Sequence, residues 1–285
     1  MKTVTTVNEV RELVSKARSE GKSIGLVPTM GALHRGHCSL VEKAVSECGY
    51  VVVSIFVNPT QFGPNEDLDA YPRTLEADGE LCRKAGAALI FAPSASEMYP
   101  ERLTTWVVVE GPLTETLCGA SRPGHFRGVT TICAKLFNIV RPDRAYFGRK
   151  DAQQLAVIRT MVRNLNMPLE IVPCETVREE SGLAMSSRNE YLSPEQRSEA
   201  IVLNKALKAC KAAFDSGEKN TGTLKTLMRE ILGGCSEGII DYAEIVDALT
   251  FERIDTIERP ALAALAVRIG PARLIDNITL RNDTP

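Results

Sequence analysis

In the first part of the chain, short apolar runs alternate with longer segments whose apolar residues recur at helical spacing. Residues 50–57, Tyr-Val-Val-Val-Ser-Ile-Phe-Val, are apolar almost throughout, which is typical of a strand covered on both faces. The pattern predicts strands over residues 23–27, 50–57, 87–92, 144–147 and 169–172, and helices over residues 39–48, 74–85, 129–140 and 152–164. Strands that alternate with helices in this way predict an α/β fold with a parallel sheet and helices on both of its faces.

The pattern changes after about Pro173, where the alternation of strands and helices ends. Ser193 is followed by a proline and, three residues after the serine, by Gln196, which predicts a capped helix start. We expect helices after Ser193 and over residues 221–232, and strands over residues 241–246, 261–269 and 274–280. The chain therefore divides into a larger α/β domain, residues 1–174, and a smaller α+β domain, residues 175–285.

Composition is compatible with two globular domains, because the 285 residues are 44% hydrophobic and 25% charged. The net charge is −2 and there is no long basic run, so we expect no nucleic-acid-binding surface. The first 22 residues mix polar and apolar side chains, unlike a signal peptide. No stretch approaches the roughly 18 apolar residues of a membrane span. We therefore expect a cytoplasmic protein that does not associate with membranes.

The eight cysteines are spread along the chain, always ten or more residues apart. They form no Cys-x-x-Cys pair and no compact cluster with histidine, which are the patterns that indicate zinc sites. Several lie in largely apolar segments, such as Cys133 in Thr-Ile-Cys-Ala-Lys-Leu-Phe. We expect reduced, mostly buried cysteines that behave as small apolar side chains.

Two of the three histidines, His34 and His37, lie three residues apart in a segment that follows a predicted strand and begins a helix. Residues at this spacing share one face of a helix, and helix N-termini bind anions through their N–H groups. Gly31 and Gly36 would let the backbone approach a ligand. Two imidazoles there can donate hydrogen bonds to a phosphate whose charge grows in a transition state. The alternative is that the histidines only cap the helix, and a zinc site would need a third ligand.

Residues 147–151, Phe-Gly-Arg-Lys-Asp, also follow a predicted strand and begin a helix. Ligands of open α/β sheets bind beyond the carboxyl ends of strands, so this loop and the histidine segment can share one crevice. Lys150 would neutralise phosphate, and Asp151 would hold a ribose hydroxyl or magnesium. A solvated turn is the alternative interpretation.

Three further segments carry polar candidates. Residues 185–188, Met-Ser-Ser-Arg, combine two hydroxyls and a guanidinium, which suits either a phosphate clamp or an ordinary polar loop. Gln61 and Gln154 can hydrogen-bond a small polar substrate, although alone they are typical surface residues. Residues 122–126, Arg-Pro-Gly-His-Phe, supply a cation and the third histidine, and alone they indicate a surface turn.

Taken together, five segments resemble the pantoate–β-alanine ligase family: residues 28–37, 58–62, 122–129, 147–154 and 185–192. They occur in the family's order and spacing, from the first predicted strand to the domain junction, whereas the chain after residue 192 is less distinctive. The resemblance implies a Rossmann-like nucleotidyltransferase domain that binds ATP and pantoate. It also implies a smaller C-terminal domain that acts as a lid.

The resemblance further implies a reaction in two steps. ATP and pantoate would give pantoyl adenylate and pyrophosphate, and β-alanine would attack the adenylate to give pantothenate and AMP. Mg²⁺ is expected with ATP, and a homodimer is usual in the family. The scheme is chemically sensible because adenylation replaces oxide, a poor leaving group, with AMP. Catalysis would then come from positioning and from charge stabilisation around the α-phosphate.

The resemblance also assigns roles to residues. His37, His34 and Lys150 would be catalytic, with His37 as the proton donor. Gln61 and Gln154 would grip pantoate, with Gln61 also near the path of β-alanine. The ATP-binding residues would be Met30, Gly31, Ala32, Leu33, His34, Arg35, Gly36, His37, Gly148, Arg149, Lys150, Asp151, Val177, Met185, Ser186, Ser187 and Arg188. Arg122 and His125 also match the family's pattern.

Two positions depart from that pattern. Arg149 stands where the family often has Glu or Gln, and Cys38 stands where Leu is common. Arg149 adds a cation beside the expected phosphate site, where it either points to solvent or alters nucleotide affinity. Neither departure changes a residue that the resemblance makes catalytic.

Two other functions compete with this interpretation. Another nucleotidyltransferase would make a different adenylate or a dinucleotide, but Gln61, Gln154 and the Met-Ser-Ser-Arg segment argue against it. A nucleotide- or metal-binding protein without activity is the second alternative, and the presence of His34, His37 and Lys150 argues against that one.

Overall fold

The computed structural model describes residues 1–64 and 66–281, and the chain forms two compact units. The first unit consists of Met1–Val109, Arg122–Arg149 and Gln154–Glu175. The second consists of Glu110–Ser121, Lys150–Gln153 and the chain from Thr176 onward. The second unit is therefore discontinuous in sequence, because two short segments from the middle of the chain group with its C-terminal part. The division into domains 1–174 and 175–285 remains a prediction.

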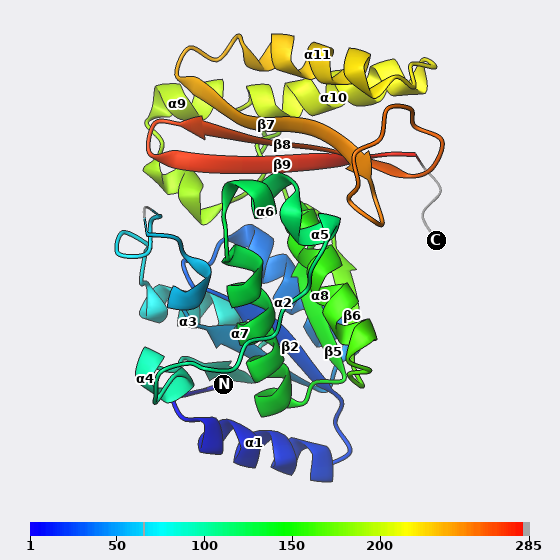
Figure 1. Cartoon of the computed structure of the whole chain (residues 1–285). Helices are drawn as coiled ribbons and strands as arrows, with labels where there is room; N and C mark the ends of the chain where they lie inside the picture. The colour runs from blue at the N-terminus through cyan, green and yellow to red at the C-terminus, as the bar shows by residue number, and fades with distance from the viewer. Residues whose placement is uncertain (65, 282–285) are drawn as a thin grey trace. The chain divides into compact units, whose positions relative to one another are not determined.

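A parallel sheet forms the centre of the first unit (Figure 1). Across the described residues its strands lie in the order β1-β4-β3-β2-β5-β6. They are β1 (Lys2–Val4), β2 (Ile24–Thr29), β3 (Tyr50–Ile55), β4 (Leu89–Phe91), β5 (Arg144–Gly148) and β6 (Glu170–Cys174). All neighbouring strands pair in parallel, which confirms the predicted α/β class. The strand order reverses between β2 and β5, the point beyond whose carboxyl ends open α/β sheets bind ligands.

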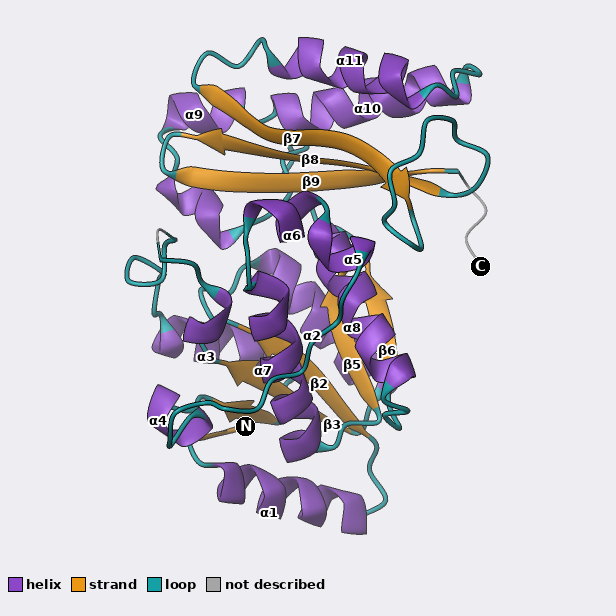
Figure 2. Cartoon of the chain, viewed as in Figure 1, coloured by secondary structure: helices purple, strands orange, loops and turns teal. Residues whose placement is uncertain are grey.

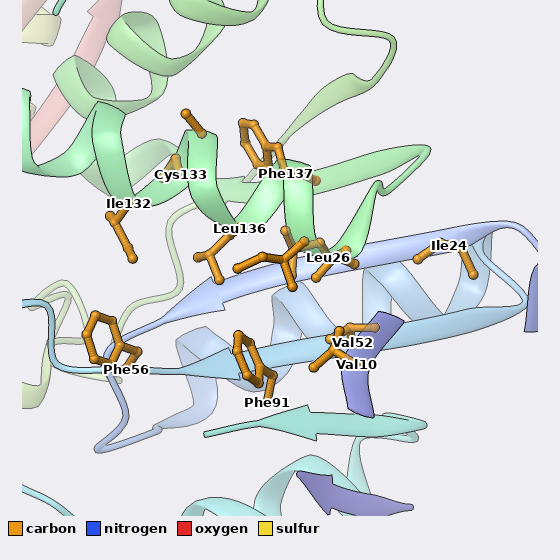
Figure 3. Close-up of a cluster of buried hydrophobic side chains, with 14 of the residues drawn as sticks. Val10, Ile24, Leu26, Val52, Phe56, Phe91, Ile132, Cys133, Leu136 and Phe137 are labelled. Atoms are coloured by element: carbon orange, nitrogen blue, oxygen red, sulfur yellow. The ribbon is translucent and has the colours of Figure 1, made fainter. Parts of the chain in front are cut away.

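Helices pack on both faces of this sheet. They are α1 (Val7–Ser19), α2 (Arg35–Glu47), α3 (Leu75–Lys84), α4 (Ala95–Met98), α7 (His125–Val140) and α8 (Ala152–Asn164), with the 3-10 turns η1 (Pro59–Gln61) and η2 (Arg149–Asp151). Successive strand residues point to opposite faces. Leu26 accordingly belongs to the core formed with α1, α7 and α8, whereas Val27 belongs to the core formed with α2. Figure 3 shows the first of these cores, in which Leu136 and Phe137 of α7 lie over Leu26.

The second unit contains an antiparallel sheet of β7 (Gly238–Asp247), β8 (Ala261–Ile269) and β9 (Ala272–Leu280), in that order (Figure 2). Its helices are α5 (Pro112–Glu115), α6 (Leu117–Ser121), α9 (Pro194–Glu199), α10 (Val202–Asp215) and α11 (Thr221–Leu232), with the 3-10 turn η3 (Ser187–Tyr191). Leu207 of α10 and Met228 of α11 form one apolar core with Leu265 of β8. This arrangement confirms the small α+β fold predicted for the tail.

Several predicted elements are confirmed to the residue, namely the helices over 152–164 and 221–232 and the strand over 261–269. Ser193 accepts a hydrogen bond from the N–H of Gln196 in a capping box, as predicted. The helix predicted from residue 129 begins earlier, at His125, which is buried together with Phe126. Residues 122–124 do form a surface turn, as predicted, but His125 and Phe126 belong to the buried start of α7.

The sequence analysis missed β1 and α1. Helix α1 begins with a capping box between Thr6 and Glu9 and buries Val10, Val14 and Ala17 at helical spacing. Strand β1 has three residues and forms only by pairing with β4, about 90 positions further along the chain. A strand this short carries too little pattern to be predicted from the sequence.

All eight cysteines are buried and none forms a disulfide, which confirms the predicted burial, although Cys118 and Cys235 also contact polar side chains. Within residues 1–64 and 66–281, no helix is both long enough and apolar enough to cross a membrane.

Candidate active site

The segment 28–37 leaves the carboxyl end of β2 and turns into α2. Gly31 and Ala32 have positive φ angles, +85° and +49°, which glycine adopts readily and alanine rarely. Gly31 has little room for a side chain, because a Cβ there would lie 3.0 Å from Asp78 Oδ2 and 3.1 Å from Ile55 Cγ2. The loop therefore follows a sharp turn that its neighbours must hold in place.

Asp78 of α3 holds this turn with its carboxylate. Oδ2 accepts a hydrogen bond from the N–H of Ala32 at 3.1 Å, and Oδ1 accepts one from the N–H of Leu33 at 2.8 Å. The hydroxyl of Thr74 donates to Oδ1 at 3.2 Å. The side chain is buried, at 1% exposure, so its hydrogen bonds go to the protein. Asp78 could not be predicted from the sequence, because it looks like any acidic residue in the first turn of a helix and lies 45 residues from Leu33.

His34 and His37 both cap α2. Nδ1 of His34 accepts from the N–H of Gly36 at 3.1 Å, and Nδ1 of His37 accepts from the N–H of His34 at 3.3 Å. A neutral imidazole that accepts at Nδ1 carries its proton on Nε2, so both rings are donors at Nε2. The ring centroids are 4.1 Å apart. The capping role is thus compatible with anion binding, because it places two adjacent N–H donors at a helix N-terminus.

Gln61 ends η1, in the loop after β3, and is only 8% exposed, so a surface position is wrong. Nδ2 of Asn58 donates to Oε1 of Gln61 at 3.0 Å and to the carbonyl of Gly128 at 3.3 Å. Oδ1 of Asn58 accepts from the N–H of Thr60 at 3.4 Å. Since a backbone N–H only donates and a carbonyl only accepts, the orientation of both side-chain amides is fixed.

The fixed amide makes Gln61 a hydrogen-bond donor toward a ligand. Its Nε2 lies 3.1 Å from Sδ of Met30, which belongs to the histidine loop. The structure therefore brings the turn 58–62 and the loop 28–37 together, a contact that was not predicted from the sequence. Asn58 lies in one of the five segments but was given no role, although an asparagine directly before Pro59 is a recognisable helix-cap signal.

Gly148 ends β5 and Arg149 begins η2, at the same sheet edge as the end of β2, because β2 and β5 are parallel neighbours. Nε of Arg149 lies 3.0 Å from Oε1 of Glu175. The Arg149 side chain is 38% exposed and that of Glu175 87%, so the pair contributes little to stability. The carboxylate of Glu175 therefore lies beside the Arg149 cation.

Lys150 and Asp151 complete η2, and Lys150–Gln153 belong to the second unit. Nδ2 of Asn277 on β9 donates to the carbonyl of Lys150 at 2.8 Å. Gln153, buried at 6% exposure, makes three hydrogen bonds of 2.8–3.0 Å to main-chain groups of residues 113–118. Neither Asn277 nor Gln153 was among the candidate residues. Gln154, which was among them, is half-buried in α8.

Val177 and the segment 185–188 also lie side by side in the second unit. The N–H of Met185 donates to the carbonyl of Val177 at 3.0 Å. Arg178 fastens this hairpin to β9 through a bidentate pair with Asp276, at 2.7 and 2.9 Å. Val177 and the segment 185–188, all expected to bind ATP, are therefore neighbours.

Ser186, Ser187 and Arg188 form the start of η3. Oγ of Ser186 accepts from the N–H of Arg188 at 3.3 Å, and Ser187 is buried. The segment is thus an ordered turn in which two hydroxyls and a guanidinium follow one another, a set that can hold an anion.

The candidate residues fall into two groups. The loop 28–37 and Gln61 lie together in the first unit, and Lys150, Val177 and the segment 185–188 lie in the second. Among the residues that the structure describes, no three His, Cys, Asp or Glu side chains gather in a way that could hold a metal ion.

Comparison with known proteins places the chain in a family. The profile of the family described as Pantoate-beta-alanine ligase matches residues 2–279. A relative from Acetivibrio thermocellus named Pantothenate synthetase is 53% identical over 278 residues, 98% of this chain and 99% of its own. A relative of the same name from Enterococcus faecalis is 54% identical over 274 residues, 96% of this chain and 97% of its own.

Solved structures agree with these relatives. The crystal structure of pantothenate synthetase from Thermus thermophilus is 50% identical and superposes with a TM-score of 0.93, over 98% of this chain and 99% of that one. A pantoate-beta-alanine ligase from Francisella tularensis, complexed with beta-gamma ATP and β-alanine, is 32% identical with a TM-score of 0.80, over 98% and 97%. With a match over nearly its whole length in sequence and fold, the chain is an enzyme of the pantoate-beta-alanine ligase family.

Proposed function

We propose that this enzyme condenses pantoate with β-alanine to pantothenate through a pantoyl adenylate, converting ATP to AMP and pyrophosphate. Family membership supports the ligation of these two substrates, and the Francisella tularensis relative was crystallised with beta-gamma ATP and β-alanine. The observation that carries the adenylation step is the pair of Nε2 donors of His34 and His37 at the N-terminus of α2, next to the buried donor of Gln61.

In the first step, a carboxylate oxygen of pantoate bonds to the α-phosphorus of ATP. The bond from that phosphorus to the bridging oxygen breaks, and pyrophosphate leaves with the electron pair. Negative charge grows on the phosphate oxygens, where preorganised donors lower the barrier. His34 and His37 donate there, with His37 as the proton donor. Lys150 adds a positive charge.

The remaining residues bind the two substrates of this step. Gln61 offers a donor, and both the carboxylate and the hydroxyl oxygens of pantoate accept hydrogen bonds. Gln154 would contact the same substrate. Residues 30–37, 148–151, Val177 and 185–188 would enclose ATP, which enters as its magnesium complex because Mg²⁺ binds substrate phosphates and water without needing a dedicated protein cage.

In the second step, the uncharged amine of β-alanine attacks the carbonyl carbon of the adenylate. The bond from that carbon to the AMP oxygen breaks, and the new amide nitrogen loses a proton. No covalent intermediate with the enzyme is required, so the protein contributes position and charge. The homodimer and the cytoplasmic location expected from the sequence stay predictions.

Exchange of labelled pyrophosphate into ATP tests this proposal. We expect exchange that requires pantoate and proceeds without β-alanine, because the first step alone regenerates ATP in reverse. The matched control replaces pantoate with β-alanine and should show no exchange. Exchange that depends on a different acid, with none on pantoate, would contradict the proposed substrate.

A further inference from the structure

A hydrogen-bond network of polar side chains connects Glu66 to the main chain of Gln61 within the first unit. Nε and Nη2 of Arg122 donate to the two carboxylate oxygens of Glu66 at 2.6 Å each. Nη1 of Arg122 lies 2.9 Å from Nε2 of His125, whose Nδ1 lies 2.8 Å from the carbonyl oxygen of Gln61. The proposed reaction uses none of these three side chains.

The partners of His125 fix its protonation. A guanidinium only donates, so Nε2 of His125 accepts from Arg122. A carbonyl only accepts, so Nδ1 of His125 donates to Gln61. The ring is therefore neutral with its proton on Nδ1, opposite to the tautomer of His34 and His37. Every hydrogen bond in this network therefore has one defined direction.

The network begins with the ion pair between Glu66 and Arg122, which is largely buried. The Arg122 side chain is 15% exposed and that of Glu66 is 22% exposed. Burial by itself would raise the pKa of Glu66, but the hydrogen bonds and charge of Arg122 outweigh it and lower the pKa to about 2. The two parallel hydrogen bonds also fix the plane of the guanidinium. The third donor, Nη1, therefore reaches His125 from a defined direction.

Close packing transmits this position to Gln61. The first turn of α7, which carries His125, lies directly against the turn 58–62. A Cβ on Gly128 of α7 would lie 2.3 Å from the carbonyl oxygen of Thr60 and 2.6 Å from Cα of Gln61. The main chain of α7 thus packs directly against the main chain of the turn 58–62, with no side chain between them. The turn therefore cannot shift relative to α7.

We infer that Glu66, Arg122 and His125 are positioning residues that set the place of Gln61 and so the affinity for the acid substrate. Nη2 of Arg122 adds a second contact to the Gln61 carbonyl, at 3.4 Å. Gln61 contacts the loop 28–37 through Met30, but Asp78 holds that loop independently of this network, so the network acts mainly on pantoate rather than on ATP. The inference rests on the proposed role of Gln61 in binding pantoate.

Pantoate-dependent pyrophosphate exchange by full-length variants tests the inference. Arg122→Lys keeps the positive charge but loses the two parallel N–H donors that hold Glu66. It should raise the KM for pantoate roughly tenfold while the KM for ATP stays within about twofold. His125→Asn places an amide nitrogen near the position of Nδ1 and should stay close to wild type. His125→Leu removes the donor and should match Arg122→Lys.

Arg127→Lys is the matched control, because Arg127 lies on the same helix and its guanidinium lies over the Trp106 ring at 4.3 Å. It should leave both KM values unchanged. An unchanged KM for pantoate in His125→Leu overturns the inference. So does an equal rise of both KM values together with a lower melting temperature in His125→Leu and Arg122→Lys, because that pattern marks a merely structural role. Wild-type exchange that does not depend on pantoate refutes the proposed function instead.

Discussion

A substitution at Asp78 is the most direct test of how the loop 28–37 is held in place. Its buried carboxylate accepts hydrogen bonds from the N–H groups of Ala32 and Leu33 and from the hydroxyl of Thr74. In Asp78→Asn, the remaining oxygen can still accept from Leu33 and Thr74. The new NH₂ group then faces the N–H of Ala32, so two donors meet without an acceptor.

The cost follows from this geometry. The variant loses one hydrogen bond to a charged group, worth about 1.5–3 kcal/mol, and leaves a buried N–H unsatisfied, at about 1–3 kcal/mol. Because the two effects overlap, we expect the free energy of unfolding to fall by about 2–4 kcal/mol. The left-handed turn at Gly31 and Ala32 also loses its main support, so the KM for ATP should rise roughly tenfold or more.

Urea unfolding gives the first quantity, and pyrophosphate exchange at varied ATP gives the second. Glu76→Gln is the matched control, because Glu76 is an exposed acid on the same helix and the change removes the same charge. That variant should stay within about 0.5 kcal/mol of wild type. The reasoning fails if Asp78→Asn is as stable as Glu76→Gln and binds ATP equally well.

Two further predictions concern the other parts of the site. His37→Ala should lower the rate of pantoate-dependent exchange on the order of 10²–10⁴-fold with an unchanged melting temperature, and full activity in that variant would remove His37 as the proton donor. The pKa of Glu66, about 2 in the folded protein against 4.5 as its ordinary value, is lowered, so its contribution of at most about 3 kcal/mol is present above pH 4.5 and is lost as the pH falls toward 2. Urea unfolding between pH 6 and 3 should therefore show the difference between wild type and Glu66→Gln shrinking, and a constant difference would contradict the ion pair.

The local pattern of apolar residues predicted those helices and strands whose buried face is marked by their own periodic apolar residues. The helix over 152–164 and the strand over 261–269 are confirmed because their apolar residues alone decide which face is buried. The pair His34 and His37 was found for the same reason, since three-residue spacing at a helix start needs no tertiary information. The sequence also marked Gln61 as a candidate, although without the family resemblance a surface position was the favoured interpretation.

The chain's own sequence thus determined the fold class, the cap at Ser193 and the five segments through which it resembles the family. Only the tertiary structure showed that Asp78 holds the loop 28–37. It also showed that a hydrogen-bond network connects Glu66 to Gln61 through Arg122 and His125. Those contacts join residues 45 to 64 positions apart, and a polar side chain carries no local signal of which distant donor it will meet. Their partners are decided by how α3 and α7 pack against the sheet, because burial leaves each charged or polar group no partner other than the ones that the fold supplies.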